Sequence, residues 1–255
     1  MDQFIRKTIG DFTAAYKHGD EIGWKNPLIA YARADDPLFA TLKKVASPTH
    51  ALPQDFLKEA RTVITYFLPF RDEVVESNKP GRFSSRVWAL AYLETNKLIA
   101  AINRLLQEQL IKQGYRAVFV PATHNFDEKT LLSDWSHRSA AYIAGLGTFG
   151  LNHMLITEKG CCGRIGSLVT DLEIPPTTRY SRELCLQKAD ASCGRCVRKC
   201  VHDALKVGGL DKQKCYEMCL INAKRLSELE SVADVCGKCL VGVPCSVTAP
   251  LIKLT

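Results

Sequence analysis

The sequence predicts an α+β fold in two parts, and three observations support that prediction. Helical patterns and short apolar runs typical of strands are mixed through residues 1–180. Nine of the eleven cysteines fall between Cys185 and Cys245, in a segment expected to build little apolar core. The turn at Pro175-Pro176 precedes this segment. We therefore predict an α+β domain over residues 1–180 and a cysteine-rich module over residues 181–255.

The expected elements follow from apolar spacing and from residues that end helices. Residues 1–17 have the pattern of an amphipathic helix, and residues 82–113 form the longest helical pattern, which Gly114 ends. Further helices are expected over residues 55–60 and 212–229. Apolar runs rich in strand-forming residues predict strands over residues 62–68, 116–120, 153–157 and 165–170.

Composition places the chain among globular proteins. Hydrophobic residues make up 46% and charged residues 24%, which suffices for a real core. The formal charge is +7, but lysine and arginine are spread along the chain, so nucleic-acid binding is only weakly indicated. No apolar run reaches the ~18 residues that span a bilayer, and no secretory signal pattern opens the chain. We expect a cytoplasmic protein without a membrane partner.

The cysteine spacing predicts two iron–sulfur clusters. Two Cys-x2-Cys pairs, Cys193/Cys196 and Cys236/Cys239, each bring two thiolates to one centre. In two-cluster ferredoxins, the last cysteine of each run ligates the other cluster. This rule defines a first set for one [4Fe–4S] cluster, consisting of Cys185, Cys193, Cys196 and Cys245. It defines a second set for another [4Fe–4S] cluster, consisting of Cys200, Cys215, Cys236 and Cys239. Three cysteines stay outside both sets: Cys161, Cys162 and Cys219.

Two other roles for the cysteines are weaker. Disulfides need an oxidising compartment, which nothing in the sequence indicates. Zinc suits two Cys-x2-Cys pairs, but a zinc site built from local pairs would not explain why Cys200 and Cys245 follow those pairs. His202 is also the only histidine in this segment of the sequence that could complete a zinc site. Seven residues separate Cys185 from Cys193 and five separate Cys239 from Cys245, unlike the common bacterial run. These departures bear on the ligand partition rather than on the presence of clusters.

A second informative stretch is the glycine-rich segment around residues 145–150. Gly145-x-Gly147-x2-Gly150 has the spacing of a dinucleotide-binding loop, but it follows a helical pattern and precedes a strand, which is the wrong order. We therefore expect a tight turn from helix to strand. Glycines in such a turn allow close backbone approach, here to a bulky cofactor.

The ordered combination of these motifs resembles epoxyqueuosine reductase, a family distantly related to the reductive dehalogenases. The resemblance covers about residues 60–250 and rests on four stretches before the cysteine run: AGLGTFG at 144–150, NHMLIT at 152–157, the glycines at 160 and 166, and LVTD at 168–171. It implies a nitroreductase-like cobalamin-binding domain joined to a two-cluster ferredoxin-like module. Electrons would pass through the clusters to a bound cobalamin.

The resemblance and the local chemistry give candidate site residues. Gly145, Gly147, Gly150 and Asn152 are candidate cofactor-binding residues. Arg138, just before the turn, suits a corrinoid side chain, a phosphate or a substrate carboxylate. The family's catalytic aspartate lies upstream of the turn, and the candidates for that role are Asp127 and Asp134, although each is also typical of a helix cap. His124 is either a proton donor or an exposed loop histidine.

The expected partners follow from the same resemblance. The family carries a C-terminal helical-repeat extension that helps hold tRNA, whereas this sequence stops at Thr255. The sequence therefore argues against tRNA and for a small organic substrate, with a ferredoxin or flavodoxin as electron donor. Two alternatives stay open. One is an electron carrier or reductive activator for a partner corrinoid enzyme, without its own cobalamin; the other is a reductase that uses flavin.

Overall fold

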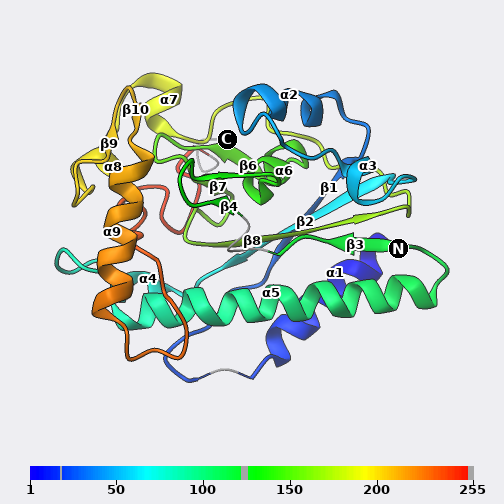
Figure 1. Cartoon of the computed structure of the whole chain (residues 1–255), viewed down its shortest axis with the longest axis horizontal. Helices are drawn as coiled ribbons and strands as arrows, with labels where there is room; N and C mark the ends of the chain where they lie inside the picture. The colour runs from blue at the N-terminus through cyan, green and yellow to red at the C-terminus, as the bar shows by residue number, and fades with distance from the viewer. Residues whose placement is uncertain (18, 122–125, 252–255) are drawn as a thin grey trace.

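A computed structural model describes residues 1–17, 19–121 and 126–251 of the chain. Its centre is a four-stranded antiparallel sheet in the order β1-β2-β8-β3 (Figure 1). The strands are β1 (Leu28–Arg33), β2 (Thr62–Pro69), β8 (Gly163–Thr170) and β3 (Ala117–Phe119). All eight residues of β2 are buried, because this inner strand has helices on both faces. That burial explains why its sequence is a continuous apolar run.

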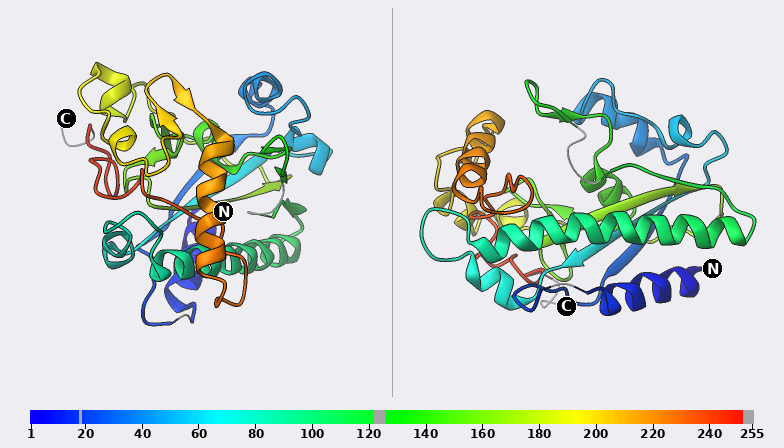
Figure 2. Two further views of the ribbon diagram at one scale, coloured as in Figure 1. Left: turned by 60° about the vertical axis from the view of Figure 1, so that its left-hand side comes forward. Right: turned by 60° about the horizontal axis from the view of Figure 1, so that its bottom comes forward.

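One face of the sheet packs against a long helix, α5 (Arg86–Lys112), together with α1 (Asp2–Ala15) and α4 (Asp72–Ser77) (Figures 1 and 2). Ser85 caps α5, since its side chain accepts a hydrogen bond from the Trp88 amide at 3.1 Å. Leu98, Ile102 and Leu106 recur at helical spacing and are fully buried. They share a core with the alternate β2 residues, such as Tyr66, that point to this face.

The other face carries a second core under shorter elements. These are α2 (Pro37–Val45), α3 (Pro53–Phe56), α6 (His137–Ile143) and the second of two hairpins. One hairpin pairs β4 (Phe126–Asp127) with β5 (Leu132–Ser133), and the other pairs β6 (Gly147–Phe149) with β7 (Leu155–Thr157). Val63 and Phe67 of β2 pack here with Trp135 and with the alanines of α6. The glycine-rich segment therefore lies above the sheet.

The cysteine-rich segment lies across one end of the sheet. It contains α7 (Leu186–Asp190), α8 (Arg195–Arg198), β9 (Leu205–Lys206), β10 (Gly209–Leu210) and α9 (Lys212–Arg225), and Figure 1 shows α9 standing beside the end of α5. The segment is not packed as a separate body. Leu184, Val235, Leu240 and Ala249 belong to the same core as α5. The division at residue 180 stays a prediction.

The structure is a mixed α/β fold with antiparallel sheets, as predicted at the level of class. The helix predicted over residues 55–60 is wrong: α3 begins at Pro53, which suits a first helical position, and Leu57 is extended. The glycine segment is also more than a turn, because Gly147 begins β6 of a hairpin. The nitroreductase-like and ferredoxin-like descriptions stay predictions. Among the helices described, none is long and apolar enough to cross a membrane.

Candidate iron–sulfur site

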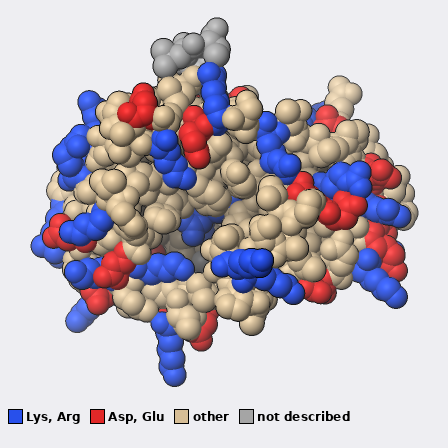
Figure 3. Space-filling view, turned by 90° about the horizontal axis from the view of Figure 1, so that it is seen from above, with Lys and Arg blue, Asp and Glu red and all other residues tan. Residues whose placement is uncertain are grey.

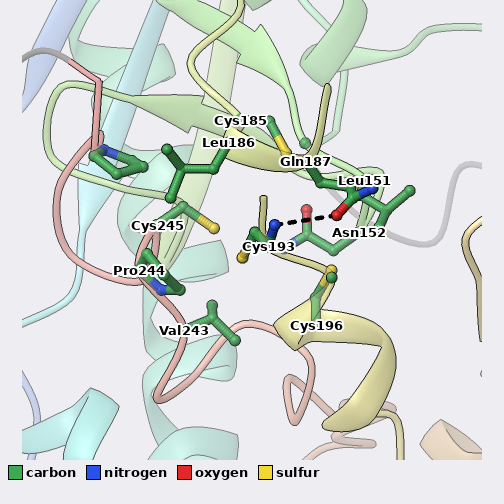
Figure 4. A pocket seen from close by; sticks show the side chains of 13 residues that line it. Leu151, Asn152, Cys185, Leu186, Gln187, Cys193, Cys196, Val243, Pro244 and Cys245 are labelled. Atoms are coloured by element: carbon green, nitrogen blue, oxygen red, sulfur yellow. Dashed lines mark hydrogen bonds between the residues drawn. The ribbon is translucent and has the colours of Figure 1, made fainter. Parts of the chain in front are cut away.

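The first set of cysteines surrounds one hollow. Cys185, Cys193, Cys196 and Cys245 all line it, and its empty volume is about 330 Å³ including space open to solvent (Figure 4). Cys185 precedes α7, and the Cys193 amide donates to the Gln187 side-chain oxygen at 3.2 Å. Gly194 adopts a left-handed φ of +65° and starts α8, which carries Cys196. The local fold thus brings residues far apart in sequence to one point.

The thiols of the first set also influence one another electrostatically. Burial raises the pKa of Cys196 to about 11, and the Cys245, Cys185 and Cys193 thiolates add to that effect. These three neighbours are the other members of the first set. Four thiolates that repel one another in this way favour a bound cation or cluster that neutralises them.

The thiols of the second set also raise one another's pKa values. Burial raises the pKa of Cys239 well above its ordinary value, and Cys236, Cys215 and Cys200 raise it further. Burial likewise raises the pKa of Cys236 to about 11, again with Cys215 and Cys200 as charged neighbours. The Leu205 amide donates to the Cys200 sulfur at 3.4 Å. The four residues predicted for the second cluster are therefore neighbours in space.

Cys215 lies on α9 one turn before Cys219. A hydrogen bond with the Cys219 thiol, helped by the positive charge of Arg138, lowers the pKa of Cys215 to about 7, although burial acts in the opposite direction. A thiol with this pKa is about half ionised at pH 7, so much more of it is thiolate, the form that binds iron, than for an ordinary cysteine. Arg138 comes from α6, so the segment beside the glycine turn reaches the second set. The sequence analysis assigned no role to Cys219, because the spacing of cysteines indicates which of them bind a cluster but not which side chains donate hydrogen bonds to those ligands.

Two further thiols lie against the first set. Cys161 and Cys162 are each 1% exposed. The Cys161 amide donates to the carbonyl oxygens of Cys245 at 2.9 Å and Ser246 at 3.1 Å, and the Cys162 amide donates to Ser246 at 3.0 Å. Asn152, which also lines the hollow, approaches the Cys161 sulfur with its side-chain nitrogen at 3.9 Å. No motif in the sequence indicates that Cys161 and Cys162 lie against the segment of Cys245.

The donor set fits four-iron clusters. Among the residues that the structure describes, no three His, Cys, Asp or Glu side chains lie close enough to share one metal ion. A four-iron cluster has a different requirement, because four cysteine thiolates are distributed over its irons. Each predicted set supplies four cysteines that are neighbours, and at least one sulfur accepts a backbone N–H bond. The ligand partition stays a prediction.

At two glycines of the turn, the space that a side chain would occupy is filled by the chain's own backbone, and their role in binding a cofactor stays a prediction. At Gly145, whose φ is +86°, an added Cβ would lie 2.9 Å from the Thr178 carbonyl oxygen. At Gly147 it would collide with the Ile156 carbonyl. The close approach that the glycines permit is therefore made by the chain's own backbone. Gly150 and Asn152 differ, because they line the hollow of the first set.

The remaining candidate residues have structural partners. Asp127 accepts hydrogen bonds from the Thr130 amide and hydroxyl and from the Lys129 amide, and these bonds lower its pKa. It caps a hairpin turn rather than a helix. Asp134 is exposed and accepts a hydrogen bond from the Thr49 hydroxyl. Neither lines the hollow, and their catalytic role stays a prediction. His124 lies outside the described residues.

Arg138 and the surface charge complete the description of the site. The Arg138 guanidinium donates to the His153 carbonyl at 2.9 Å and contacts the Met154 sulfur at 3.3 Å, so it holds the turn between β6 and β7. Figure 3 shows the face seen from above, which has a surface depression near its middle with Lys and Arg side chains around that depression.

These features define a mixed α/β fold with two groups of four cysteines at one end of its sheet. No family profile and no curated protein matches the chain. Solved structures do match. Epoxyqueuosine reductase from Streptococcus thermophilus aligns with a TM-score of 0.59 at 16% identity, over 99% of this chain and 70% of the other. A reductive dehalogenase structure described with a mechanism for B12-dependent dehalogenation aligns with a TM-score of 0.53 at 18% identity, over 83% of this chain and 29% of the other.

A further match concerns tRNA. An epoxyqueuosine reductase in complex with an epoxyqueuosine-modified stem loop of tRNA-Tyr aligns with a TM-score of 0.58 at 17% identity, over 86% of this chain and 56% of the other. The prediction that tRNA is not a partner is contradicted by this structure, because a protein of the same fold binds tRNA. The resemblance seen in the sequence is thus confirmed at the level of the fold.

Proposed function

We propose that this protein is an iron–sulfur oxidoreductase that passes electrons through two [4Fe–4S] clusters to a reducible acceptor. The first set of cysteines would hold one cluster and the second set the other. When bound, such clusters supply one-electron transfer at low potential. The similarity to reductases in fold supports the same class of activity.

One observation carries the proposal. All four members of the first set line one hollow. The charged neighbours of Cys239 are the other three members of the second set and, after them, Cys196 of the first set. In this proposal the two sets exchange one ligand each: Cys245 completes the set of the earlier cysteines, and Cys200 completes the set of the later ones. Local zinc knuckles would use nearby pairs and would not need this exchange.

The chain's own residues have defined tasks in this proposal. The amide of Leu205 supports the Cys200 sulfur, and Arg138 stabilises the Cys215 thiolate. Lys188, Arg195 and Arg198 are exposed on α7 and α8, close in sequence to the first set. Their positive charge suits docking of an acidic electron donor such as a ferredoxin or flavodoxin.

Two candidates differ in the acceptor that receives the electrons. In the first, cobalamin bound at the turn of residues 145–150 supplies the reducing chemistry. In the second, the chain is an electron carrier or reductive activator that serves a partner corrinoid enzyme and binds no cobalamin itself, which is compatible with the backbone that fills the side-chain positions at Gly145 and Gly147. A small organic molecule and a modified tRNA are both acceptors to be tested, the second because of the tRNA-bound structure of this fold.

Anaerobic reconstitution of the full chain tests the proposal. Iron and acid-labile sulfide should each reach about eight per chain, as two four-iron clusters require. Cobalamin and flavin are then added separately, and retained cobalt or flavin is measured after gel filtration. Retained cobalt supports the reductase with its own corrinoid, and eight irons without cobalt or flavin supports the electron carrier. Zinc without iron after anaerobic purification would refute both.

A further inference from the structure

The two sets of cysteines have different electrostatic surroundings. Apart from its cysteines, the hollow of the first set is lined, among the described residues, by glycine, leucine, valine, proline, asparagine and glutamine, all of which are uncharged. The second set differs, because Lys238 lies between Cys236 and Cys239 in the sequence and is 3% exposed. The proposed function gives this buried lysine no task.

The Lys238 side chain is held in place by the loop between α4 and α5. Its Nζ donates to the carbonyl oxygens of Asn78 at 2.7 Å and Pro80 at 2.8 Å. The Asn78 side chain in turn donates to the Cys236 carbonyl at 2.9 Å. Burial lowers the pKa of Lys238, and the negative charge of Cys236 acts in the opposite direction. Because Lys238 directly precedes Cys239, its Nζ lies within about 10 Å of the Cys239 Cα.

The N-terminal end of α5 lies against the same segment. Ser84, just before the helix, donates its hydroxyl to the Cys236 carbonyl at 2.8 Å. A Cβ added at Gly237 would lie 2.4 Å from the ring of Trp88, which belongs to the first turn of the helix. The N-terminus of a helix carries a partial positive charge of roughly half an elementary charge. The buried ammonium and this helix end therefore act on the second set with the same sign.

Two other groups of charges act less strongly on the difference between the sets. Asp234, two residues before Cys236, is negative, but its carboxylate accepts from the Tyr92 hydroxyl at 2.8 Å. The Arg164 guanidinium lies 4.3 Å from the centre of the Tyr92 ring, so a positive charge is close to the same group. The basic side chains of α7 and α8, near the first set, are exposed. Water and salt therefore screen them.

We propose that Lys238 and the N-terminal end of α5 raise the reduction potential of the second-set cluster above that of the first-set cluster, so that electrons pass from the first set to the second. The inference rests on the proposed function, because it requires both clusters. In this step the first-set cluster loses one electron and the second-set cluster gains it. The donor-docking side chains proposed on α7 and α8 are close in sequence to the first set, at the start of this path.

The size of the effect follows from the charge that reduction adds. A reduced cluster carries one more negative charge than an oxidised one, so a fixed positive charge stabilises the reduced form more. At an effective dielectric constant of about 20, a unit charge about 10 Å away changes the ratio of reduced to oxidised cluster about tenfold. The burial of Lys238 keeps water from screening this charge.

The test is a redox titration of the reconstituted full chain, followed by electron paramagnetic resonance. The two signals are assigned with Cys245→Ala, which should retain the second-set cluster alone. In wild type, the second-set cluster should be reduced at the higher potential. In Lys238→Met, the ratio of reduced to oxidised second-set cluster at a fixed potential should fall about tenfold, which corresponds to about 59 mV for one electron. The ratio for the first-set cluster should change less than about twofold.

Lys199 provides a matched control, because it directly precedes Cys200 of the second set but is exposed. Lys199→Met removes the same charge at a position that water screens, so the ratio should change less than about twofold. Lys238→Gln retains a donor for the carbonyls but loses the charge. It should lower the ratio about tenfold as well, and it is the variant to measure if Lys238→Met does not fold.

Four results would overturn the inference. A first-set cluster that is reduced at the higher potential in wild type would reverse the direction of transfer. About eight irons with an unchanged ratio in the Lys238 variants would show that the ammonium does not act on the cluster. An equal shift in Lys199→Met would assign the effect to surface charge in general. Loss of the second-set irons in both Lys238 variants would make the lysine a structural residue. Wild-type protein that binds no iron would instead refute the proposed function as well, so the two failures are distinguishable.

Discussion

His137, the first residue of α6, should make the stability of this protein depend on pH in a defined window. Its ring bridges the Ser167 hydroxyl at 2.8 Å and the Pro121 carbonyl at 3.1 Å. The carbonyl can only accept, so the ring nitrogen facing it carries the proton and the other nitrogen accepts from Ser167. The same serine oxygen accepts from the Trp135 indole at 3.0 Å. This network suits a neutral imidazole.

The magnitude follows from the pKa of that imidazole. Burial lowers the pKa of His137 from 6.5 to about 4. Above pH 6.5 the ring is neutral in both folded and unfolded chains. Between pH 6.5 and about 4, the unfolded chain binds a proton that the folded chain does not, so the free energy of unfolding falls as pH falls. The loss is about 1 kcal/mol from pH 7.5 to 5.5, and about 3 kcal/mol in full.

The assay is urea denaturation of wild type and His137→Gln at matched iron content, under anaerobic conditions, from pH 7.5 to 5. Glutamine retains a donor and an acceptor but does not titrate. Other titrating groups contribute equally to both proteins, so the difference between the two curves isolates His137. The difference in the free energy of unfolding should change by about 1 kcal/mol between pH 7.5 and 5.5, and the variant should lose less stability than wild type. Parallel curves would refute the reasoning.

Three other predictions concern the cysteine-rich end. Cys245→Ala should lower iron to about four per chain, as one lost cluster requires, whereas Cys219→Ala should keep about eight; equal losses would exclude the partition. Gly160→Ala should lower the free energy of unfolding by more than about 1 kcal/mol, because its φ is +77° and its Cβ would meet Ser246; an unchanged thermal midpoint would contradict the packing. Lys238 is 3% exposed and donates to two carbonyls at 2.7 and 2.8 Å, so Lys238→Met should cost about 2–4 kcal/mol in urea denaturation; a cost below about 0.5 kcal/mol would show that water replaces the donor.

The sequence alone supports a prediction of the ligands because cluster chemistry constrains cysteine spacing, and the structure brings the four cysteines of the first set to one hollow. The long helix and the inner strands were also predictable, since periodicity records which positions are buried. The glycine turn was only partly interpretable for a physical reason: a glycine indicates that some group comes close to the backbone, but it does not indicate which group. At Gly145 the approaching group is Thr178, more than thirty residues later. The role of Asp127 could not be predicted from the sequence either, because a capping residue and a catalytic residue can both be an aspartate.

The packing of Cys161 is of a different kind. Its amide donates to the Cys245 carbonyl, and nothing in either local pattern anticipates this contact between residues far apart in sequence. Contacts of this type depend on how the β6–β7 hairpin and the final loop pack together, which is tertiary information.

The shared core has a consequence for how this chain can be divided. Leu184, Val235, Leu240 and Ala249 pack with the residues of α5 that cover the sheet. A fragment that ended at residue 180 would expose that apolar surface to water and should aggregate. Limited proteolysis should accordingly yield no soluble sheet fragment, and oxidative loss of a cluster should loosen the sheet along with its ligands. A chain that lost a cluster would then unfold as a whole, and the cluster-binding segment and the sheet would be degraded together.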